Sequence, residues 1–184
     1  MKAVFLDRDG TINHEESNYL LDLKKLKIFD ESFEAIQLLN QHGFKTIVVT
    51  NQSCVGRGLL EERDLQKINS ALKKKLAERK ARVDSIYYCP HHPNDQCVCR
   101  KPKLGMFEQA VKEHKISLKK SFVIGDREFD IHAGKAAGCK TILVLTGAGQ
   151  QTLGSLKHSP DQPDFVASHI LDAAHWIIRQ TASQ

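Results

Sequence analysis

The sequence contains no long hydrophobic run, few aromatic residues and only five cysteines. No apolar segment approaches the roughly 20 residues that a membrane-spanning helix needs. Met1 and Lys2 are followed directly by a short apolar run, which leaves no room for the apolar segment and cleavage site of a signal peptide. We therefore expect a soluble cytoplasmic protein, in which cysteines serve as thiols or metal ligands rather than in disulfides.

The 184 residues, of which 41% are apolar and 27% charged, suit one domain, which we place at residues 1–184 with a frayed tail at 181–184. The net charge of +5 favours an anionic partner. The lysines are concentrated in places such as 73–75, however, and no aromatic residues are interleaved with them. The charge fits a phosphate substrate and does not by itself exclude nucleic acid. Our expectation for the whole chain is a monomer that binds a small phosphorylated molecule, with no nucleic acid or membrane as its partner.

Short apolar runs alternate with amphipathic stretches along the chain. The runs expected to form strands are Ala3–Leu6, Thr46–Val49, Ile86–Tyr88, Ser121–Ile124 and Thr141–Leu145. The stretches with apolar residues at helical spacing are 31–41, 62–81, 104–114, 130–137 and 168–180. This alternation predicts an α/β fold, a doubly wound parallel sheet with helices on both faces. The segment 146–164, which contains several glycines and prolines, is predicted to be a long mobile connection.

Polar residues able to take part in chemistry follow several of these predicted strands. Asp7 and Asp9 follow the first strand, Thr50 begins a polar segment after the second, and Asp126 follows the fourth. The carboxyl ends of parallel strands lie at one edge of a sheet, so we expect these side chains to meet there. Turn chemistry explains each residue singly but explains their joint recurrence poorly.

Two carboxylates one residue apart repel each other unless a cation compensates their charge. Mg²⁺ prefers oxygen ligands and retains positions for water and a substrate phosphate. We predict a Mg²⁺ site formed by Asp7, Asp126 and the backbone carbonyl of Asp9. Asp7 is then the candidate nucleophile, and the side chain of Asp9 the candidate general acid and base. Asp130 either supports this site or only begins the next helix, and we do not assign it to the site.

A loop at about 89–99 combines three sulfurs and an imidazole within a short stretch of chain. A set of four such ligands predicts a structural, tetrahedral Zn²⁺ site. His92 could replace the adjacent His91 as the imidazole ligand. Isolated buried thiols that bind no metal are the alternative. Arg100 and Lys101 follow directly, so an ordered loop would present both cations to the oxygens of a phosphoryl group. The predicted zinc ligands are Cys89, His91, Cys97 and Cys99.

Four segments, in chain order, resemble the four motifs of the haloacid dehalogenase superfamily of phosphohydrolases. The metal loop makes the chain similar to the zinc-containing branch of that superfamily. The resemblance implies a haloacid dehalogenase-like Rossmannoid fold without a large cap, and a Mg²⁺-dependent phosphatase that forms an aspartyl-phosphate on Asp7. The four segments are Asp7-Arg8-Asp9-Gly10-Thr11, Thr50-Asn51-Gln52, Arg100-Lys101-Pro102 and Gly125-Asp126.

The same resemblance implies roles for the remaining motif residues. Thr50 and Lys101 are expected to stabilise the transferring phosphoryl group. The substrate-binding residues are expected to be Asp7, Asp9, Thr50, Asn51, Gln52, Ser53, Arg100 and Lys101.

Two substrates are known in the zinc-containing branch. One activity removes the 7-phosphate of D-glycero-D-manno-heptose 1,7-bisphosphate in lipopolysaccharide precursor synthesis, and the other hydrolyses histidinol phosphate in histidine synthesis. The segments 56–58 and 105–106 resemble the heptose enzymes, whereas the short metal loop also suits histidinol phosphatases. We favour the heptose substrate. A zinc-organised nucleic-acid-binding module is an alternative from another class, against which the lack of an aromatic stacking cluster argues.

Overall fold

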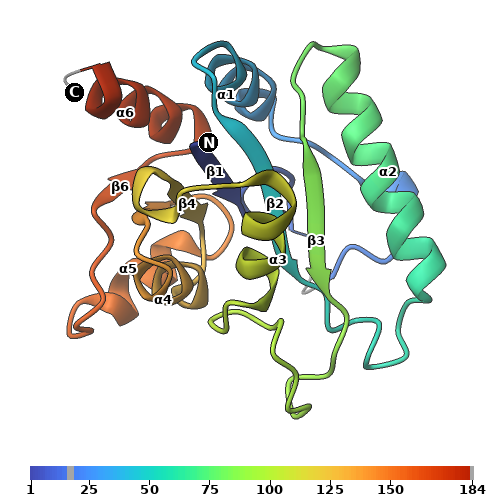
Figure 1. Ribbon diagram of the computed structural model, residues 1–184. Helices are drawn as coiled ribbons and strands as arrows, with labels where there is room; N and C mark the ends of the chain where they lie inside the picture. Colours follow the sequence, from blue (N-terminus) through green and yellow to red (C-terminus); the bar gives the residue numbers. More distant parts are fainter. Residues whose placement is uncertain (16–18, 183–184) are drawn as a thin grey trace.

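Six parallel strands form one sheet in the order β3-β2-β1-β4-β5-β6, as the computed structural model shows (Figure 1). The structure describes residues 1–15 and 19–182. The strands are β1 (Ala3–Leu6), β2 (Lys45–Asn51), β3 (Ser85–Cys89), β4 (Phe122–Gly125), β5 (Lys140–Val144) and β6 (Phe165–Ala167). The α-helices in the described part are α1 (Asp30–Gln41), α2 (Glu62–Glu78), α3 (Gly105–His114), α4 (Glu128–Ala136), α5 (Gly149–Leu156) and α6 (Ile170–Ala182). The predicted α/β class with a doubly wound parallel sheet is confirmed.

The direction in which strands are added reverses between β1 and β4. The chain builds β1, β2 and β3 outward on one side, then returns to add β4, β5 and β6 on the other. Ligands of open α/β sheets bind outside the carboxyl ends of the strands at such a reversal point. Asp7 directly follows β1 and Asp126 directly follows β4, so both acids stand at this point.

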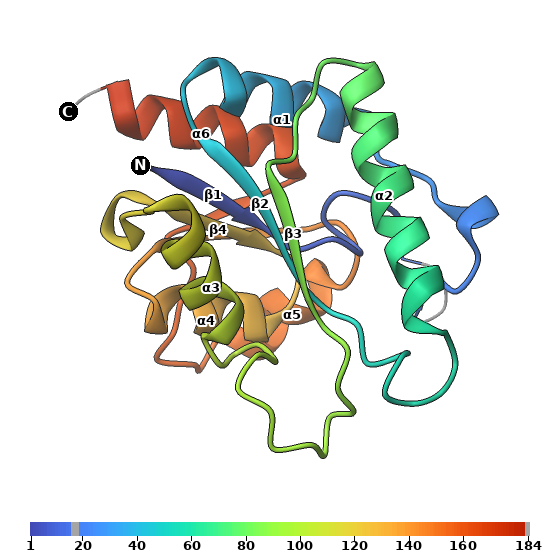
Figure 2. The same ribbon diagram turned by 45° about the vertical axis from the view of Figure 1, so that its right-hand side comes forward.

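The sheet separates two apolar layers, because successive side chains of a strand point to opposite faces. Val4 and Leu6 belong to the core under α1, α2 and α6, whereas Ala3 and Phe5 belong to the core under α3 and α4 (Figure 2). All four residues of β1 are buried. A central parallel strand is covered on both faces, which explains why β1 is a continuous apolar run rather than an alternating one.

Two details of the chain differ from the sequence-based expectations. The segment 146–164 is not an irregular connection, because it contains α5, and β6 begins directly after it at Phe165. Thr152 and Leu156, four residues apart, bury one face of α5. The expected fraying from 181 is also wrong for its first two residues, which complete α6, while 183–184 lie outside the described residues. In the described ranges we find no helix with the length and apolar character required to cross a bilayer.

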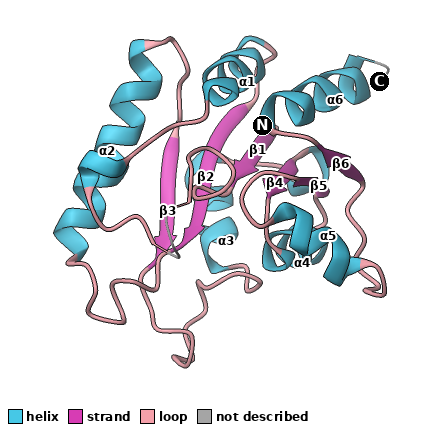
Figure 3. Cartoon of the chain, turned by 180° about the vertical axis from the view of Figure 1, so that it is seen from behind, coloured by secondary structure: helices cyan, strands magenta, loops and turns pink. Residues whose placement is uncertain are grey.

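β3 and β6 are the outer strands of the sheet (Figure 3). Both are attached to their neighbours by the same set of contacts. An aspartate just before each strand pairs with a threonine near the start of the neighbouring strand. Asp84 donates its backbone N–H to Thr46 O and accepts from Thr46 N at 2.9 Å. Asp164 does the same with Thr141, whose N–H donates to Asp164 Oδ2 at 2.7 Å. These contacts continue the ladder beyond the strand and fix its register.

Each aspartate also binds a lysine. Lys45 Nζ lies 2.8 Å from Asp84 Oδ1, and Lys135 Nζ lies 2.8 Å from Asp164 Oδ2. Burial raises the pKa of Asp164, but the hydrogen bonds from Lys135 and Thr141 outweigh this effect and lower that pKa below its usual value. The lowered pKa means that the ionised form stabilises the fold.

We expect Asp84→Asn to lower the free energy of unfolding by about 1–2 kcal/mol, because this nearly buried carboxylate holds both a lysine and a backbone N–H. Asp164→Asn should lower it by less than about 1 kcal/mol, because its side chain is a third exposed. Urea unfolding at pH 7 measures both values. The Asp164 difference should shrink below about pH 4, as the wild-type carboxylate gains a proton, and a difference unchanged at pH 3 would rule out the charge as its cause.

Candidate active site

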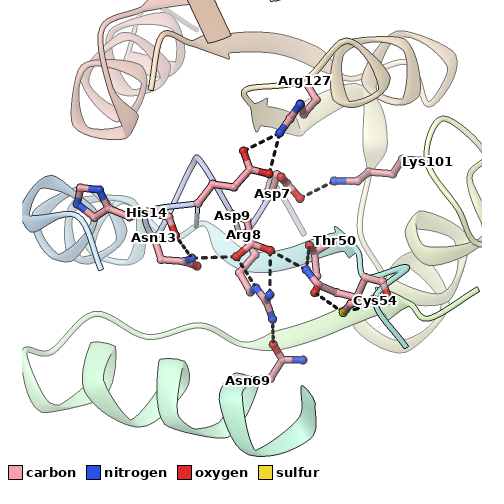
Figure 4. Close-up of polar contacts among 12 residues, drawn as sticks. Asp7, Arg8, Asp9, Asn13, His14, Thr50, Cys54, Asn69, Lys101 and Arg127 are labelled. Atoms are coloured by element: carbon pink, nitrogen blue, oxygen red, sulfur yellow. Dashed lines mark hydrogen bonds and ion pairs between the residues drawn. The ribbon is translucent and has the colours of Figure 1, made fainter. Parts of the chain in front are cut away.

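Asp7 extends β1 by one residue into the carboxyl edge of the sheet. Its backbone N–H donates to Ile124 O at 2.9 Å, which continues the pairing with β4 and holds the residue rigidly. Its side chain is nearly buried, and Asp7 Oδ1 accepts a hydrogen bond from Lys101 Nζ at 2.8 Å (Figure 4). A rigid carboxylate beside an ammonium group is suited to act as an oriented nucleophile.

Three buried carboxylates gather at this point: Asp7, Asp126 and Asp130 each offer an oxygen within 4.8 Å of the others. Asp126 Oδ2 accepts from Ala148 N at 2.8 Å, whereas its buried Oδ1 has no hydrogen-bond partner among the described residues. Burial, together with the negative charges of Asp7 and Asp130, raises the pKa of Asp126 to about 8. An unpartnered carboxylate oxygen among three acids is the donor set that a hard divalent cation prefers, so the residues fit Mg²⁺.

Glycines hold the chain close to Asp126. Gly10 and Gly147 both have positive φ, of 80° and 56°, and a Cβ built on either residue would overlap Asp126 Oδ2. Only glycine combines this conformation with so close an approach. The two turns therefore enclose the carboxylate and leave its remaining oxygen for the acid cluster.

Lys101 is the buried cation of the cluster. Its Nζ lies 2.8 Å from Asp7 Oδ1, 2.6 Å from Asp130 Oδ1 and 2.6 Å from Val49 O. Burial alone would lower the pKa of Lys101, but the charges of Asp130 and Asp7 outweigh it and raise that pKa. Burial raises the pKa of Asp130 to about 7, although Lys101 opposes the shift. The lysine is therefore held charged against Asp7.

Asn51 fixes the backbone of Lys101. Asn51 Oδ1 accepts from Lys101 N at 3.0 Å, and its Nδ2 donates to Lys101 O at 3.2 Å. This pair of bonds ties the segment after the metal loop to the end of β2. It explains how a lysine from an irregular segment reaches the acids at the reversal point.

Asp9 lies on the opposite side of Asp7 from Lys101 (Figure 4). Its two oxygens accept hydrogen bonds from Arg8, Asn13 and Gln52 at 2.8–3.2 Å. Burial raises the pKa of Asp9, but the adjacent Arg8 charge and these hydrogen bonds outweigh burial and lower that pKa. Gln52 Nε2 also donates to Thr50 Oγ1 at 2.9 Å, which connects Asp9 to the hydroxyl at the end of β2.

A cavity of about 450 Å³ opens over these groups. Its wall carries three arginines, Arg57, Arg100 and Arg127, together with the acids Asp7, Asp9 and Glu15. Glu15 is paired with Arg127, whose Nη2 lies 2.6 and 2.7 Å from the two Glu15 oxygens. The lining residues are Asp7, Asp9, Glu15, Tyr19, Thr50, Asn51, Ser53, Arg57, Leu59, Arg100, Arg127 and Phe129.

The structure brings the residues proposed from the sequence to one place, at two depths. Asp7, Asp9, Thr50, Asn51, Ser53 and Arg100 line the cavity. Gln52, Lys101 and Asp126 are buried behind its wall, where Gln52 bonds to Asp9 and Thr50 rather than lining the cavity.

Other cavity residues were not assigned from the sequence. Arg127 could have been suspected, because it directly follows Asp126. Asp130, which was considered from the sequence and not assigned, is buried beside Lys101 rather than in the cavity wall. Glu15 and Tyr19 belong to the segment 14–19 after the first motif, which corresponds to a substrate-contacting segment of the heptose enzymes but whose contacts could not be assigned from the sequence. Residues 16–18 of that segment lie outside the described residues.

The metal loop places its four predicted ligands together. One atom from each of Cys89, His91, Cys97 and Cys99 lies within 4.8 Å of the others, and His91 Nδ1 is 3.2 Å from Cys99 Sγ. His92 is directed elsewhere, since its Nδ1 accepts from Asn94 N at 3.2 Å. Three sulfurs and one imidazole at these separations suit tetrahedral Zn²⁺ with a complete protein shell.

Comparison with known proteins agrees with this geometry. Residues 98–173 match the HAD-hydrolase-like family. The chain is 36% identical, over all its length and 98% of the relative, to D-glycero-D-manno-heptose-1,7-bisphosphate 7-phosphatase of Chlorobaculum tepidum. It is 42% identical to the corresponding β-heptose enzyme of Pasteurella multocida, over 79% of this chain and 83% of that protein.

A solved structure is also similar. The D,D-heptose 1,7-bisphosphate phosphatase of B. bronchiseptica, in complex with magnesium and phosphate, superposes with a TM-score of 0.90 at 31% identity, covering 98% of this chain and 99% of the other. Both the full-length similarity and the shared fold agree with the motifs at the carboxyl edge of the sheet. The chain therefore belongs to the haloacid dehalogenase-like family of phosphatases that these relatives represent.

Proposed function

We propose that this phosphatase removes the 7-phosphate of D-glycero-D-manno-heptose 1,7-bisphosphate in a Mg²⁺-dependent reaction through an aspartyl-phosphate on Asp7. The observation that carries the proposal is the cluster of Asp7, Asp126 and Asp130 around Lys101 at the reversal point of the sheet. The similarity to heptose bisphosphate phosphatases supports the substrate. The nucleic-acid-binding alternative is set aside, because the chain belongs to a family of enzymes.

Asp7 is proposed to attack the phosphorus atom, forming a bond between its carboxylate oxygen and phosphorus as the bond to the sugar oxygen breaks. Lys101 orients Asp7 by its 2.8 Å contact and places positive charge beside the equatorial phosphoryl oxygens. Thr50 supplies a hydroxyl donor from the cavity wall. When bound by Asp7, Asp126 and the backbone carbonyl of Asp9, Mg²⁺ supplies the charge that offsets repulsion between the carboxylate and the phosphate dianion.

Asp9 is proposed to move the protons. It gives one to the departing sugar oxygen and then takes one from the water that hydrolyses the aspartyl-phosphate. Its contacts with Arg8, Asn13 and Gln52 keep it ionised in the free protein, which is the form that the second step requires. The arrival of a phosphate dianion raises the pKa of a neighbouring carboxyl by like-charge repulsion, which favours the protonated form for the first step.

The charge of the cavity favours a bisphosphate over histidinol phosphate. Arg127 is paired with Glu15, so Arg57 and Arg100 are the lining arginines that can meet a second anion when one phosphate is at Asp7. Histidinol phosphate carries an ammonium group, which these two arginines repel. The volume of about 450 Å³ accommodates a sugar with two phosphates.

We expect purified protein with Mg²⁺ to hydrolyse heptose 1,7-bisphosphate with a kcat/KM at least about 100-fold above that for histidinol phosphate. The reason is that the bisphosphate presents a second anion to Arg57 and Arg100, whereas histidinol phosphate presents an ammonium group to them. Phosphate release measured side by side on the two esters tests this. The reverse ranking would assign the chain to the histidinol phosphatases.

Asp7→Asn should reduce turnover by about 10³-fold or more, because an amide is a poor nucleophile toward phosphorus. Its thermal unfolding midpoint should stay within a few degrees of wild type, since one of three repelling acids is neutralised while the contact with Lys101 is weakened. Asp161→Asn, a change outside the cavity, is the matched control and should keep full activity. Substantial turnover by Asp7→Asn would exclude the covalent mechanism.

We further propose that the loop binds structural Zn²⁺ and thereby orders Arg100. Cys99→Ser should abolish stoichiometric zinc, measured by mass spectrometry of metals, and raise KM by about fivefold or more because Arg100 follows directly. Cys139→Ser, a buried cysteine outside the loop, should retain both zinc and KM. Full activity of zinc-free protein supplied only with Mg²⁺ would remove zinc from the functional account.

A further inference from the structure

Arg8, between the two motif acids, is a fully buried guanidinium. Its Nε donates to Asp9 Oδ1 at 3.2 Å and its Nη2 to Asp9 Oδ2 at 2.8 Å (Figure 4). This two-point contact fixes the plane of the carboxylate as well as its position, because the guanidinium is a rigid planar fork. Arg8 is absent from the cavity wall, so its contacts are made behind Asp9 and away from the substrate.

The third contact of Arg8 is made with helix α2. Arg8 Nη1 donates to Asn69 Oδ1 of α2 at 2.8 Å. The orientation of this amide follows from chemistry, because arginine only donates and the oxygen must therefore face it. Asn69 Nδ2 is buried without a partner among the described residues.

Asn69 interrupts an otherwise apolar buried face of α2. The other buried residues of that helix are Leu65, Ile68, Leu72 and Leu76. A buried amide with an unpartnered N–H₂ group costs about 1–3 kcal/mol relative to a satisfied or apolar side chain. The side-chain oxygen of Asn69 accepts a hydrogen bond from Arg8, and this contact explains why the position is an asparagine.

We propose that Asn69 and Arg8 are positioning residues that hold the Asp9 carboxylate in its working orientation, a role that rests on the phosphatase function proposed above. Asn69 holds Nη1 of the guanidinium, and Nε and Nη2 then hold the Asp9 carboxylate. Asn13 and Gln52 complete the support from the sides at 2.9 and 2.8 Å. The packing of α2 on the core thereby sets the position of a proton-transferring group that α2 does not touch.

Steady-state kinetics of Asn69 variants with heptose 1,7-bisphosphate and Mg²⁺ tests this role. Asn69→Ala removes the acceptor and should lower kcat about tenfold while KM stays within about twofold, because Asp9 is misplaced and the substrate contacts remain. Asn69→Asp keeps an acceptor for Arg8 and should retain at least about half of the wild-type kcat. Ser70→Ala, at the exposed neighbouring position of α2, is the matched control and should match wild type.

Arg8→Lys removes the guanidinium that connects Asn69 to Asp9. It replaces Asn69→Ala as the test variant if Asn69→Ala folds poorly, which circular dichroism and unfolding curves reveal. The loss in the double variant should be no greater than in Arg8→Lys alone, because both changes act through one path. Equal kcat for wild type and Asn69→Ala, or equal losses in Asn69→Ala and Asn69→Asp, overturns the positioning role alone. A wild-type protein with no turnover of any phosphate ester overturns the proposed function and this inference with it.

Discussion

The site depends on the imbalance of charge among four buried groups. Asp7, Asp126 and Asp130 form a cluster of three carboxylates, of which Asp7 and Asp130 contact the ammonium group of Lys101. Full ionisation leaves two negative charges in a desolvated place, which is unfavourable without a further cation. The raised pKa values of Asp126 and Asp130, about 8 and about 7, express this imbalance in the free protein. Under the proposed function, a divalent cation supplies the positive charge that offsets this repulsion.

The sheet is what makes such a cluster possible. Asp7 follows β1, whereas Asp126 and Asp130 come from the end of β4 and the first turn of α4. Central strands buried on both faces keep these segments in place. The continuity of β1 into Asp7 through the bond to Ile124 O is the most rigid of these links. The edge strands are farther from the acids and are held by Asp84 and Asp164 instead. The centre of the sheet therefore places the acids, and local contacts anchor its edges.

The sequence was sufficient to predict the sheet and its central acids, because Asp7 and Asp126 directly follow apolar runs and the ends of parallel strands must coincide. It was insufficient for Asp130, since an acid in the first turn of a helix is equally explained by the helix dipole. The contact of Glu15 with Arg127 joins residues 112 positions apart and has no local signal. Helix α5 was missed because glycines occupy its first position and its interior, and β6 because three residues are too few to show a period.

The side chains at the cavity are held in place in two different ways, which sequence patterns distinguish poorly. Asp9 and Lys101 are fixed by fully buried partners, Arg8 and Asp130, so their geometry belongs to the core. Arg100, by contrast, follows a loop in which His91 is exposed, Cys97 and Cys99 are half-buried, and Cys89 lies in the core. A metal ion with four protein ligands can supply the order that such a loop cannot obtain from its own side chains. Under the proposed function, the phosphoryl-transfer groups are therefore held by the core, whereas Arg100 depends on the order of the loop before it.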